Sequence, residues 1–349
     1  MSAHQNPDRS QPHNKILVIK LGALGDFIQS LGCMRAIRQH HPEAKITLLT
    51  TKSFEKIAKD CGYFDDIWLD DKPRFFELGK WLALKKRLNQ ARFERVYDLQ
   101  NNDRTGLYFT LLKTPKPEWS GIVKGASHRN ADPQRFHRHA FKGHVQTLML
   151  AGIPEHLITI DPLDWAQGNI EGLKLRKPYI VFAAGSAPNR KEKRWPAHYY
   201  GALAQTLSDQ GYQVVLIGTM AELDVNAKIK ALCPDALDLT AKTCLFDLVA
   251  LARGAAATIG NDTGPMHLMA PTGTPAFVIF SSHSNPEIHA PLGKAVHIFN
   301  GGNLALLTAE AVLSEFQKFM ENHQKEKISS ANSNSDEQST QNTGEKKTL

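Results

Sequence analysis

The chain has 349 residues, more than a single hydrophobic core ordinarily spans, and this length suits two domains of about 150 residues each. Its hydrophobic content of 42% is typical of a globular protein, and no stretch approaches the roughly 20 apolar residues that a transmembrane helix needs. The net charge of +7 lies in the first half: residues 15–164 hold 24 Lys and Arg against 17 Asp and Glu, whereas residues 165–321 hold 13 of each. This asymmetry favours an anionic partner for the first half, with ordinary solvated side chains as the alternative.

The two ends of the chain and its cysteines point to no further structure. Residues 1–14 and 323–349 are polar and poor in apolar side chains, and the sequence predicts disordered tails there. The first tail lacks the apolar core of a signal peptide. The four cysteines have neither metal-ligand spacing nor the density of a disulfide framework. We therefore expect a cytoplasmic protein.

The first half of the chain alternates predicted strands and helices. Short apolar runs predict buried strands, and apolar residues at a helical period predict helices. Strands are expected at residues 16–19, 46–49, 67–69 and 95–99, and helices at about 26–40, 75–91 and 103–112. Residues 113–140 are basic and are expected to be irregular.

A second unit of similar type begins at residue 179. Strands are expected at residues 179–182, 213–217, 256–259 and 276–280, and helices at about 196–209, 221–232, 245–253, directly after Pro265, and at 308–322. Pro271 should end the helix after Pro265 early, because its ring removes a hydrogen-bond donor and clashes with the preceding turn.

This alternation is typical of an α/β protein with mostly parallel sheets. We predict two Rossmann-like, doubly wound domains, at residues 15–165 and 178–322, with a linker near residues 163–178. Ligands of such sheets bind beyond the carboxyl ends of the strands. The site is therefore expected in a cleft between two facing domains, and each distinctive motif does follow a predicted strand.

The first motif is the run Lys20–Asp26, after the first predicted strand. Gly22 and Gly25 allow the backbone to approach a ligand closely. Asp26 begins the next helix, where its carboxylate serves either as a helix cap or as a general base on an acceptor hydroxyl. The run does not have the G-x-G-x-x-G spacing, and no acidic residue ends the second strand, so a nicotinamide dinucleotide site is poorly supported.

The second motif, Ala184–Pro196, places four cations within five residues after a buried strand. Such a cluster suits phosphate oxygens, with Lys193 or Arg194 neutralising charge on a leaving diphosphate; a solvated basic loop is the alternative. Glu222 follows the next strand. It either accepts a hydrogen bond from a ribose or a base, or complements the helix dipole.

The third motif, Gly260–His267, is the most informative. It follows a predicted strand, and Pro265 begins a helix that Asp262 or Thr263 can cap. The free N–H groups of such a helix start form a natural cradle for a diphosphate, with His267 on the first turn beside it. A capped turn that binds no ligand is the alternative.

Together these motifs resemble the ADP-heptose:lipopolysaccharide heptosyltransferase family, glycosyltransferase family 9, over about residues 15–320. The resemblance rests on these stretches, which occur in the family's order: Leu21–Asp26, Asp98–Gln100, Lys193–Pro196, Gly260–His267 and Gly273–Pro275. Met269–Thr272 departs from the run of small helix-forming residues usual in the family, which bears on the shape of the donor pocket.

The resemblance implies a GT-B fold and an inverting, metal-independent transfer of heptose from ADP-heptose to the lipopolysaccharide inner core. Asp26 would be the catalytic base, in an amino-terminal domain that binds the acceptor. The carboxyl-terminal domain would bind the donor through Lys193, Arg194, Glu222, Asp262, Thr263, Gly264 and His267. Contacts to the anionic acceptor are expected among Gly22, Arg104, Arg129, Arg135, His137 and His144.

We expect no cofactor, no metal and no nucleic-acid partner, since the chain lacks a P-loop, a metal-chelating D-x-D and paired cysteines. The basic first half fits a phosphorylated, lipid-linked acceptor and peripheral contact with the cytoplasmic face of the inner membrane, although no amphipathic anchor is evident. Three alternatives remain: a GT-B transferase of another nucleotide sugar, a non-catalytic nucleotide-sugar or lipopolysaccharide-binding protein, and a dinucleotide-dependent oxidoreductase.

Overall fold

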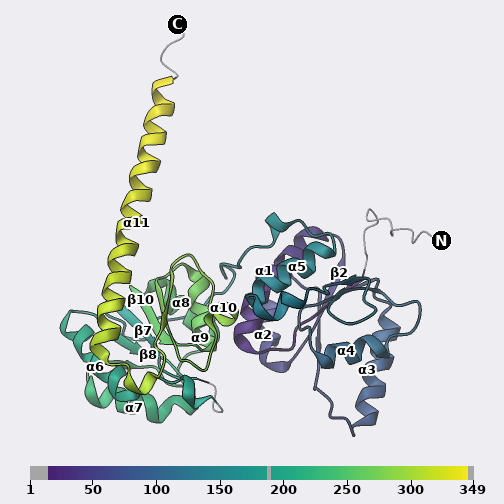
Figure 1. Ribbon diagram of the computed structural model, residues 1–349, viewed down its shortest axis with the longest axis horizontal. Coiled ribbons are helices and arrows are strands. Elements are labelled where there is room, and N and C mark those ends of the chain that lie inside the picture. Colours follow the sequence, from purple (N-terminus) through teal and green to yellow (C-terminus); the bar gives the residue numbers. More distant parts are fainter. Residues whose placement is uncertain (1–14, 187–189, 345–349) are drawn as a thin grey trace. The chain divides into compact units, whose positions relative to one another are not determined.

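The computed structural model describes residues 15–186 and 190–344, in which the chain forms two compact units (Figure 1). Unit 1 comprises the described residues up to Asn169 together with Asn285–Leu292, and unit 2 comprises Ile170–Ser284 and the described residues from Gly293 onwards. The return of Asn285–Leu292 to unit 1 differs from the predicted partition. The amino-terminal tail and residues 187–189 of the second motif lie outside the described residues.

Unit 1 contains, within the described residues, a six-stranded parallel sheet with the order β3-β2-β1-β4-β5-β6. Its strands are β1 (Lys15–Ile19), β2 (Lys45–Thr50), β3 (Asp66–Leu69), β4 (Arg95–Asp98), β5 (Glu118–Gly121) and β6 (His128–Arg129). Its helices are α1 (Leu24–His40), α2 (Glu55–Asp60), α3 (Leu78–Ala91), α4 (Asp103–Leu111), α5 (Ala140–Leu150) and the short α10 (Pro286–His289). Helices α3 and α4 pack against one face of the sheet, and α1 and α5 lie beside each other on the other face (Figure 1).

Unit 2 repeats this architecture, with the strand order β12-β11-β10-β7-β8-β9 in its described residues. Its strands are β7 (Tyr179–Ala183), β8 (Gln213–Leu216), β9 (Leu237–Asp238), β10 (Ala257–Asn261), β11 (Ala276–Phe280) and β12 (Val296–Asn300). Its helices are α6 (Ala197–Asp209), α7 (Leu223–Leu232), α8 (Leu245–Gly254), α9 (Gly264–Met269) and α11 (Ala309–Gly344). Helices α6, α7 and α11 share one hydrophobic core with the sheet, and α8 and α9 lie on the opposite side (Figure 1).

Both sheets have the strand order of a Rossmann fold, which confirms the predicted pair of doubly wound parallel sheets. Strands covered by helices on both faces are apolar along their length, and Ile16–Ile19 and Tyr179–Phe182 are accordingly buried. The strand order reverses between β1 and β4 in unit 1 and between β7 and β10 in unit 2. Ligands of such sheets bind beside this reversal, beyond the carboxyl ends of the strands. The first and third motifs follow β1 and β10, so each lies at a reversal point.

The structure also contains short elements that the sequence does not predict. Strands β5 and β6 lie within residues 113–140, which the sequence predicts to be irregular, and α2, α5, β9, β12 and α10 are likewise unpredicted. Strands β5, β6 and β9 have only two to four residues, which is too short to show an alternating pattern. By contrast, the expected effect of Pro271 is confirmed, because α9 ends at Met269 and a 3₁₀ turn follows.

The last helix corrects the predicted carboxyl-terminal tail. The sequence predicts a helix ending near residue 322 and disorder beyond it, but α11 continues to Gly344. No proline or glycine interrupts residues 309–343, so nothing in the backbone stops a helix there. No helix within the described ranges is both long enough and apolar enough to cross a membrane.

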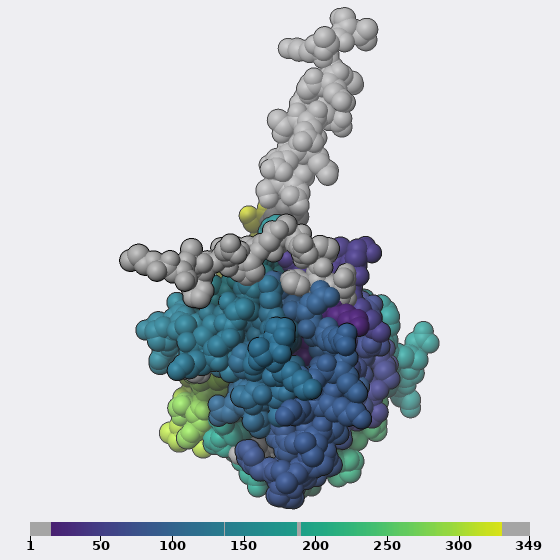
Figure 2. All heavy atoms as spheres, turned by 90° about the vertical axis from the view of Figure 1, so that its right-hand side faces the viewer, coloured from purple at the N-terminus to yellow at the C-terminus, as the bar shows by residue number. Residues whose placement is uncertain are grey.

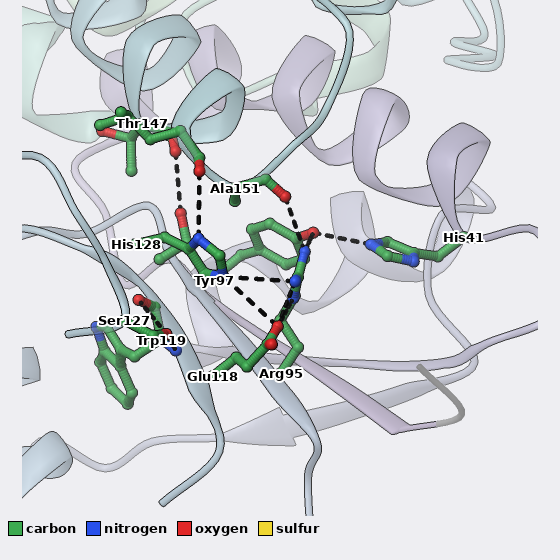
Figure 3. A network of polar contacts seen from close by, with 11 residues as sticks. His41, Arg95, Tyr97, Glu118, Trp119, Ser127, His128, Thr147 and Ala151 are labelled. Atoms are coloured by element: carbon green, nitrogen blue, oxygen red, sulfur yellow. Dashed lines mark hydrogen bonds and ion pairs between the residues drawn. The ribbon is translucent and has the colours of Figure 1, made fainter. Parts of the chain in front are cut away.

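A buried polar network joins the amino-terminal ends of β4 and β5 (Figure 3). The guanidinium of Arg95, at the start of β4, donates to the Glu118 carboxylate, to the Tyr97 hydroxyl at 3.1 Å and to the Ala151 carbonyl at 2.9 Å. The Tyr97 hydroxyl also lies 2.8 Å from Nε2 of His41. Because parallel strands begin at one edge of the sheet and end at the other, this network lies at the edge opposite the motif loops. We infer that it stabilises unit 1 and takes no part in chemistry.

We expect Arg95→Met to lower the free energy of unfolding by about 2–4 kcal/mol, because it removes the guanidinium that donates to the partly buried Glu118 carboxylate and to the buried Ala151 carbonyl. Urea unfolding followed by tryptophan fluorescence is a suitable measurement, since four of the five tryptophans belong to unit 1. Lys124→Met, which removes an exposed cation of the same unit, is the control and should change stability by less than about 0.5 kcal/mol. Equal stability of the two variants would show that the network contributes little.

Candidate functional site

The loop after β1 brings Asp26 to the carboxyl edge of the sheet in unit 1. Gly22 has a φ of +125°, and a Cβ there would meet the ring of Phe54 at 3.1 Å, so this position requires glycine. Asp26 lies in the first turn of α1, and its Oδ2 accepts a hydrogen bond of 3.3 Å from the Ala23 N–H. That bond is a capping-box contact to the N-cap residue Ala23, which corresponds to one of the two roles that the sequence allows for Asp26. The side chain is nevertheless partly exposed, so its carboxylate is open to a ligand.

Two buried charges hold this loop against the end of β4. The Lys20 Nζ donates to the Leu99 carbonyl at 2.9 Å, and burial lowers the pKa of Lys20 while the carboxylates of Asp26 and Asp98 partly oppose that shift. Burial raises the pKa of Asp98 to about 6. Hydrogen bonds to its carboxylate, including those from the N–H groups of Asn101 and Gln100, lower the pKa but do not outweigh burial. The Gln100 Oε1 in turn accepts from the Leu21 N–H at 2.8 Å. The loops after β1 and β4 are therefore hydrogen-bonded to each other next to Asp26.

The residues expected to meet an anionic acceptor are not equally suited to it. His137 and Arg129 are exposed, and Arg104 and Arg135 are partly exposed, so these four side chains are accessible. His144 is buried in α5; burial lowers its pKa well below the ordinary value, and the nearby Lys20 and His139 lower it further. A buried, uncharged imidazole has no charge to offer an anion, which removes the reason for placing His144 among these contacts.

In unit 2, three side chains from three loops meet at the ends of β10 and β11. The Lys193 Nζ lies 2.5 Å from Oδ2 of Asp262 and donates to the Ser284 Oγ at 3.1 Å. The Ser284 hydroxyl donates to the same Asp262 oxygen at 2.6 Å. An ammonium carries three N–H donors, and these contacts use two of them. This cluster therefore orients Lys193 and, among the described residues, leaves it one donor for an anionic ligand.

Asp262 acts in this cluster as a fixed anion. Burial acts to raise its pKa, but hydrogen bonds from His267, Lys193 and Ser284 outweigh burial and hold the pKa well below the ordinary carboxyl value. His267 is buried, with Nε2 3.9 Å from Oδ1 of Asp262. Thr263 is the N-cap residue of α9, but its side chain makes no capping hydrogen bond, and Asp262 faces Lys193. The predicted side-chain cap is therefore wrong, and the Gly264 N–H has no side-chain cap among the described residues. Pro265 has no N–H, and the Met266 N–H donates to the Thr263 carbonyl at 3.0 Å.

The sequence does not single out Asn261 and Ser284, yet both organise this cluster. The buried Asn261 side chain accepts from the Trp195 N–H and the Tyr200 hydroxyl, both at 3.1 Å, and donates to the Ala184 and Gly185 carbonyls at 2.8 and 3.1 Å. These four bonds use its full hydrogen-bonding capacity and join the second motif to the third. Asn261 could have been found in the sequence, because it is a polar residue at the end of a buried strand in the Gly260–His267 run. Ser284 lies in an ordinary polar loop, and nothing in the sequence distinguishes it.

Arg194 and Glu222 take local structural roles near the same edge of the sheet. Arg194 donates to the Ser186 Oγ at 3.0 Å and to the Ser186 carbonyl at 2.9 Å, so it holds the loop after β7. Glu222 accepts from the N–H and the hydroxyl of Thr219 at 2.9 and 2.7 Å. Its side chain covers Gly185, where a Cβ would approach Glu222 Cγ to 2.4 Å. Glu222 therefore lies between the loops after β7 and β8.

Both units thus carry their polar clusters at the reversal points of their sheets. The sequence profile of Glycosyltransferase family 9 (heptosyltransferase) matches residues 81–314, which is well over half of the chain. The chain belongs to glycosyltransferase family 9. It is therefore a glycosyltransferase, as the motifs predict.

The similarity of this family 9 member to individual relatives extends over most of its length. It is 25% identical over 314 residues to lipopolysaccharide heptosyltransferase 2 of Escherichia coli K12, covering 81% of this chain and 87% of the relative. Its fold is similar to that of the E. coli ADP-heptose LPS heptosyltransferase II, with a TM-score of 0.68, 23% identity, and 89% and 99% of the two chains covered. E. coli heptosyltransferase WaaC, solved with ADP-2-deoxy-2-fluoro heptose, gives a TM-score of 0.69 at 18% identity, with 87% and 99% covered. The predicted GT-B fold class is thereby confirmed.

Proposed function

We propose that this protein transfers heptose from ADP-heptose to the inner core of lipopolysaccharide with inversion at the anomeric carbon. The observation that carries the proposal is the Lys193–Asp262–Ser284 cluster at the reversal point of unit 2, within the part of the chain that matches family 9. The relatives support the substrates, since they are named lipopolysaccharide heptosyltransferases and one was solved with an ADP-heptose analogue.

On the donor side, Lys193 would bind the diphosphate. Its ammonium is held by Asp262 and Ser284, so its remaining donor is directed without further loss of side-chain freedom. The uncapped N–H groups at Thr263–Gly264 would donate to the same diphosphate. Because α9 has only six residues, these direct hydrogen bonds would contribute more to anion binding than the helix dipole. Asp262, itself an anion, would position Lys193 and His267. Arg194 and Glu222 would shape the loops around the nucleotide.

On the acceptor side, Asp26 would act as the general base. In the proposed step the acceptor hydroxyl oxygen attacks the anomeric carbon, and its proton passes to the Asp26 carboxylate. The bond from that carbon to the diphosphate oxygen breaks, and ADP leaves with the electron pair. Attack on the face opposite the leaving group inverts the configuration. Lys193 would balance the charge that grows on the diphosphate, a role that in other transferases often falls to a metal ion.

We further propose that the reaction takes place in the cytoplasm, with peripheral contact at the inner membrane, because the acceptor of this proposal is lipid-linked. Its anionic groups would meet the accessible side chains of Arg104, Arg129, Arg135 and His137.

The experiment that tests this function is acceptor-dependent release of nucleoside diphosphate. The protein is incubated with ADP-heptose, GDP-mannose or UDP-glucose, each with and without a truncated lipopolysaccharide core, in the presence of EDTA. We expect release of ADP from ADP-heptose only when the core is present. Release from another donor would identify a different transferase, and binding of ADP-heptose without any release would identify a non-catalytic binding protein.

A further inference from the structure

The loop after β3 and helix α3 of unit 1 expose large apolar side chains that have no role in the proposed reaction. Phe75 and Phe76 are the central residues of a turn that is closed by a hydrogen bond of 2.9 Å from the Glu77 N–H to the Arg74 carbonyl. Their exposed fractions are 85% and 75%. Two adjacent phenylalanines at the tip of a turn are costly to leave in water, which indicates a surface that another phase or molecule covers.

Helix α3 continues this surface. Leu78 and Leu82, one helical turn apart, are 68% and 65% exposed. At 100° per residue, Lys85 and Lys86 flank this pair on its two sides, and both lysines are exposed. The turn and the helix together therefore form an apolar strip with cations along its margins, which we call the Phe75–Lys86 surface.

The opposite side of α3 fixes this surface to unit 1. Leu88 is buried, and Trp81 and Leu84 pack against the same hydrophobic core. The indole Nε1 of Trp81 donates to the Arg74 carbonyl at 3.0 Å, which ties the helix to the turn. The Arg74 guanidinium lies 6.0 Å from the ring centre of Phe76. The exposed side chains are thus presented by a supported element, seen as the blue protrusion at the bottom of Figure 2.

We propose that the Phe75–Lys86 surface docks unit 1 onto an anionic phospholipid bilayer. Residues 71–87 contain six Lys and Arg against two acidic residues, Asp71 and Glu77, and Glu77 is paired with Lys80 at 2.5 Å. Cations at the margin of an exposed apolar strip complement lipid phosphates while the apolar side chains enter the acyl region. A second copy of this chain would bring the same excess of positive charge to the contact and would be repelled by it.

The position of this surface within unit 1 agrees with a lipid-linked acceptor. The turn that carries Phe75 and Phe76 follows β3, and Asp26 follows β1, so both lie at the carboxyl edge of the same parallel sheet. Arg104, in the first turn of α4, donates to the Pro73 carbonyl at 3.3 Å and lies 5.9 Å from the ring centre of Trp81, so a candidate acceptor contact adjoins the surface. Docking would therefore bring the acceptor-binding edge of unit 1 to the membrane. Only this last argument rests on the proposed function.

The test is flotation of the full chain with vesicles of phosphatidylcholine alone or with added phosphatidylglycerol. We expect binding to the anionic vesicles that weakens as salt rises. Phe75→Ser/Phe76→Ser should reduce the partition coefficient at least about tenfold, and Lys85→Glu/Lys86→Glu by about fivefold or more for each charge. The matched controls are Leu306→Ser, an apolar residue of unit 2 that is 76% exposed, and Lys228→Glu, an exposed cation of unit 2; both should bind like the parent.

Three results would overturn the docking proposal: no binding of the parent to anionic vesicles, undiminished binding of both surface variants, or a concentration-dependent dimer that Phe75→Ser/Phe76→Ser abolishes. Vesicle binding needs neither donor nor transfer, so it is independent of the proposed reaction. The Phe75→Ser/Phe76→Ser variant should retain full transfer to a delipidated core in solution and lose transfer to a core embedded in vesicles. Failure of all variants to transfer heptose, with vesicle binding intact, would contradict the proposed function and leave the docking surface standing.

Discussion

Asp26→Asn is expected to abolish transfer while leaving donor binding nearly intact. The amide has the same size as the carboxylate but cannot accept the acceptor's proton, and loss of a general base costs about 10²–10⁴-fold in rate. The proposed donor groups belong to unit 2, whereas Asp26 belongs to unit 1, so the affinity for ADP should change little. The measurement is kcat for heptose transfer beside the Kd for ADP from calorimetry.

Asp103→Asn is the matched control for this prediction. Asp103 is also an acidic residue in the first turn of a helix that follows a strand of the same sheet, and it is exposed. Both variants lose a similar charge–helix interaction, worth about 0.3–1 kcal/mol of stability. Transfer by Asp26→Asn at a rate close to that of Asp103→Asn would show that Asp26 is only a helix-capping residue and that the base is another group.

Lys193→Met should weaken ADP binding and slow transfer by about 10²–10³-fold, the usual cost of removing one preorganised electrostatic contact. It should also reduce stability by about 1–3 kcal/mol, because Asp262 is then a buried carboxylate without its cation. The pair has a defined pH dependence. Since the pKa of Asp262 is lowered in the folded protein, its contribution is fully present above the ordinary carboxyl pKa of about 4 and is lost as the pH falls below it.

Two further variants separate catalysis from stability at this cluster. Lys193→Met/Asp262→Asn removes both charges and should recover much of the stability lost in the single variant without recovering transfer. Lys191→Met removes an exposed cation of the same basic loop, two positions away, and should retain ADP affinity within about twofold, as is usual for an exposed surface charge. Equal losses in Lys191→Met and Lys193→Met would favour the solvated basic loop over a directed phosphate contact.

The sheets were predictable because their strands are buried on both faces. Runs such as Ile16–Ile19 and Tyr179–Phe182 must be continuously apolar, and a continuous apolar run is visible in the sequence. Short strands such as β6 are held by pairing with neighbours and carry no such pattern. The length of α11 was missed for a different reason: a polar composition indicates disorder, yet no residue in that segment stops a helix.

The candidate site was predictable as separate loops but not as contacts. The motifs name Lys193 and Asp262, which are 69 positions apart in the chain, and only the fold brings them together. Ser284 and Asn261 act through hydrogen bonds whose partners come from other loops, so their residue types alone do not reveal them. The Phe75–Lys86 surface was missed because the sequence places Phe75 and Phe76 in a helix over residues 75–91, whereas they lie on an exposed turn and the helix begins at Leu78.

The most direct test of the proposed reaction is the anomeric configuration of its product. The protein is incubated with ADP-heptose and a truncated inner core, and the product is examined by mass spectrometry and by NMR of the new anomeric centre. We predict a core that has gained one heptosyl residue, with an anomeric configuration opposite to that of the donor. An unmodified core, or a heptosyl residue that keeps the donor's configuration, would contradict direct displacement by an acceptor hydroxyl that Asp26 deprotonates.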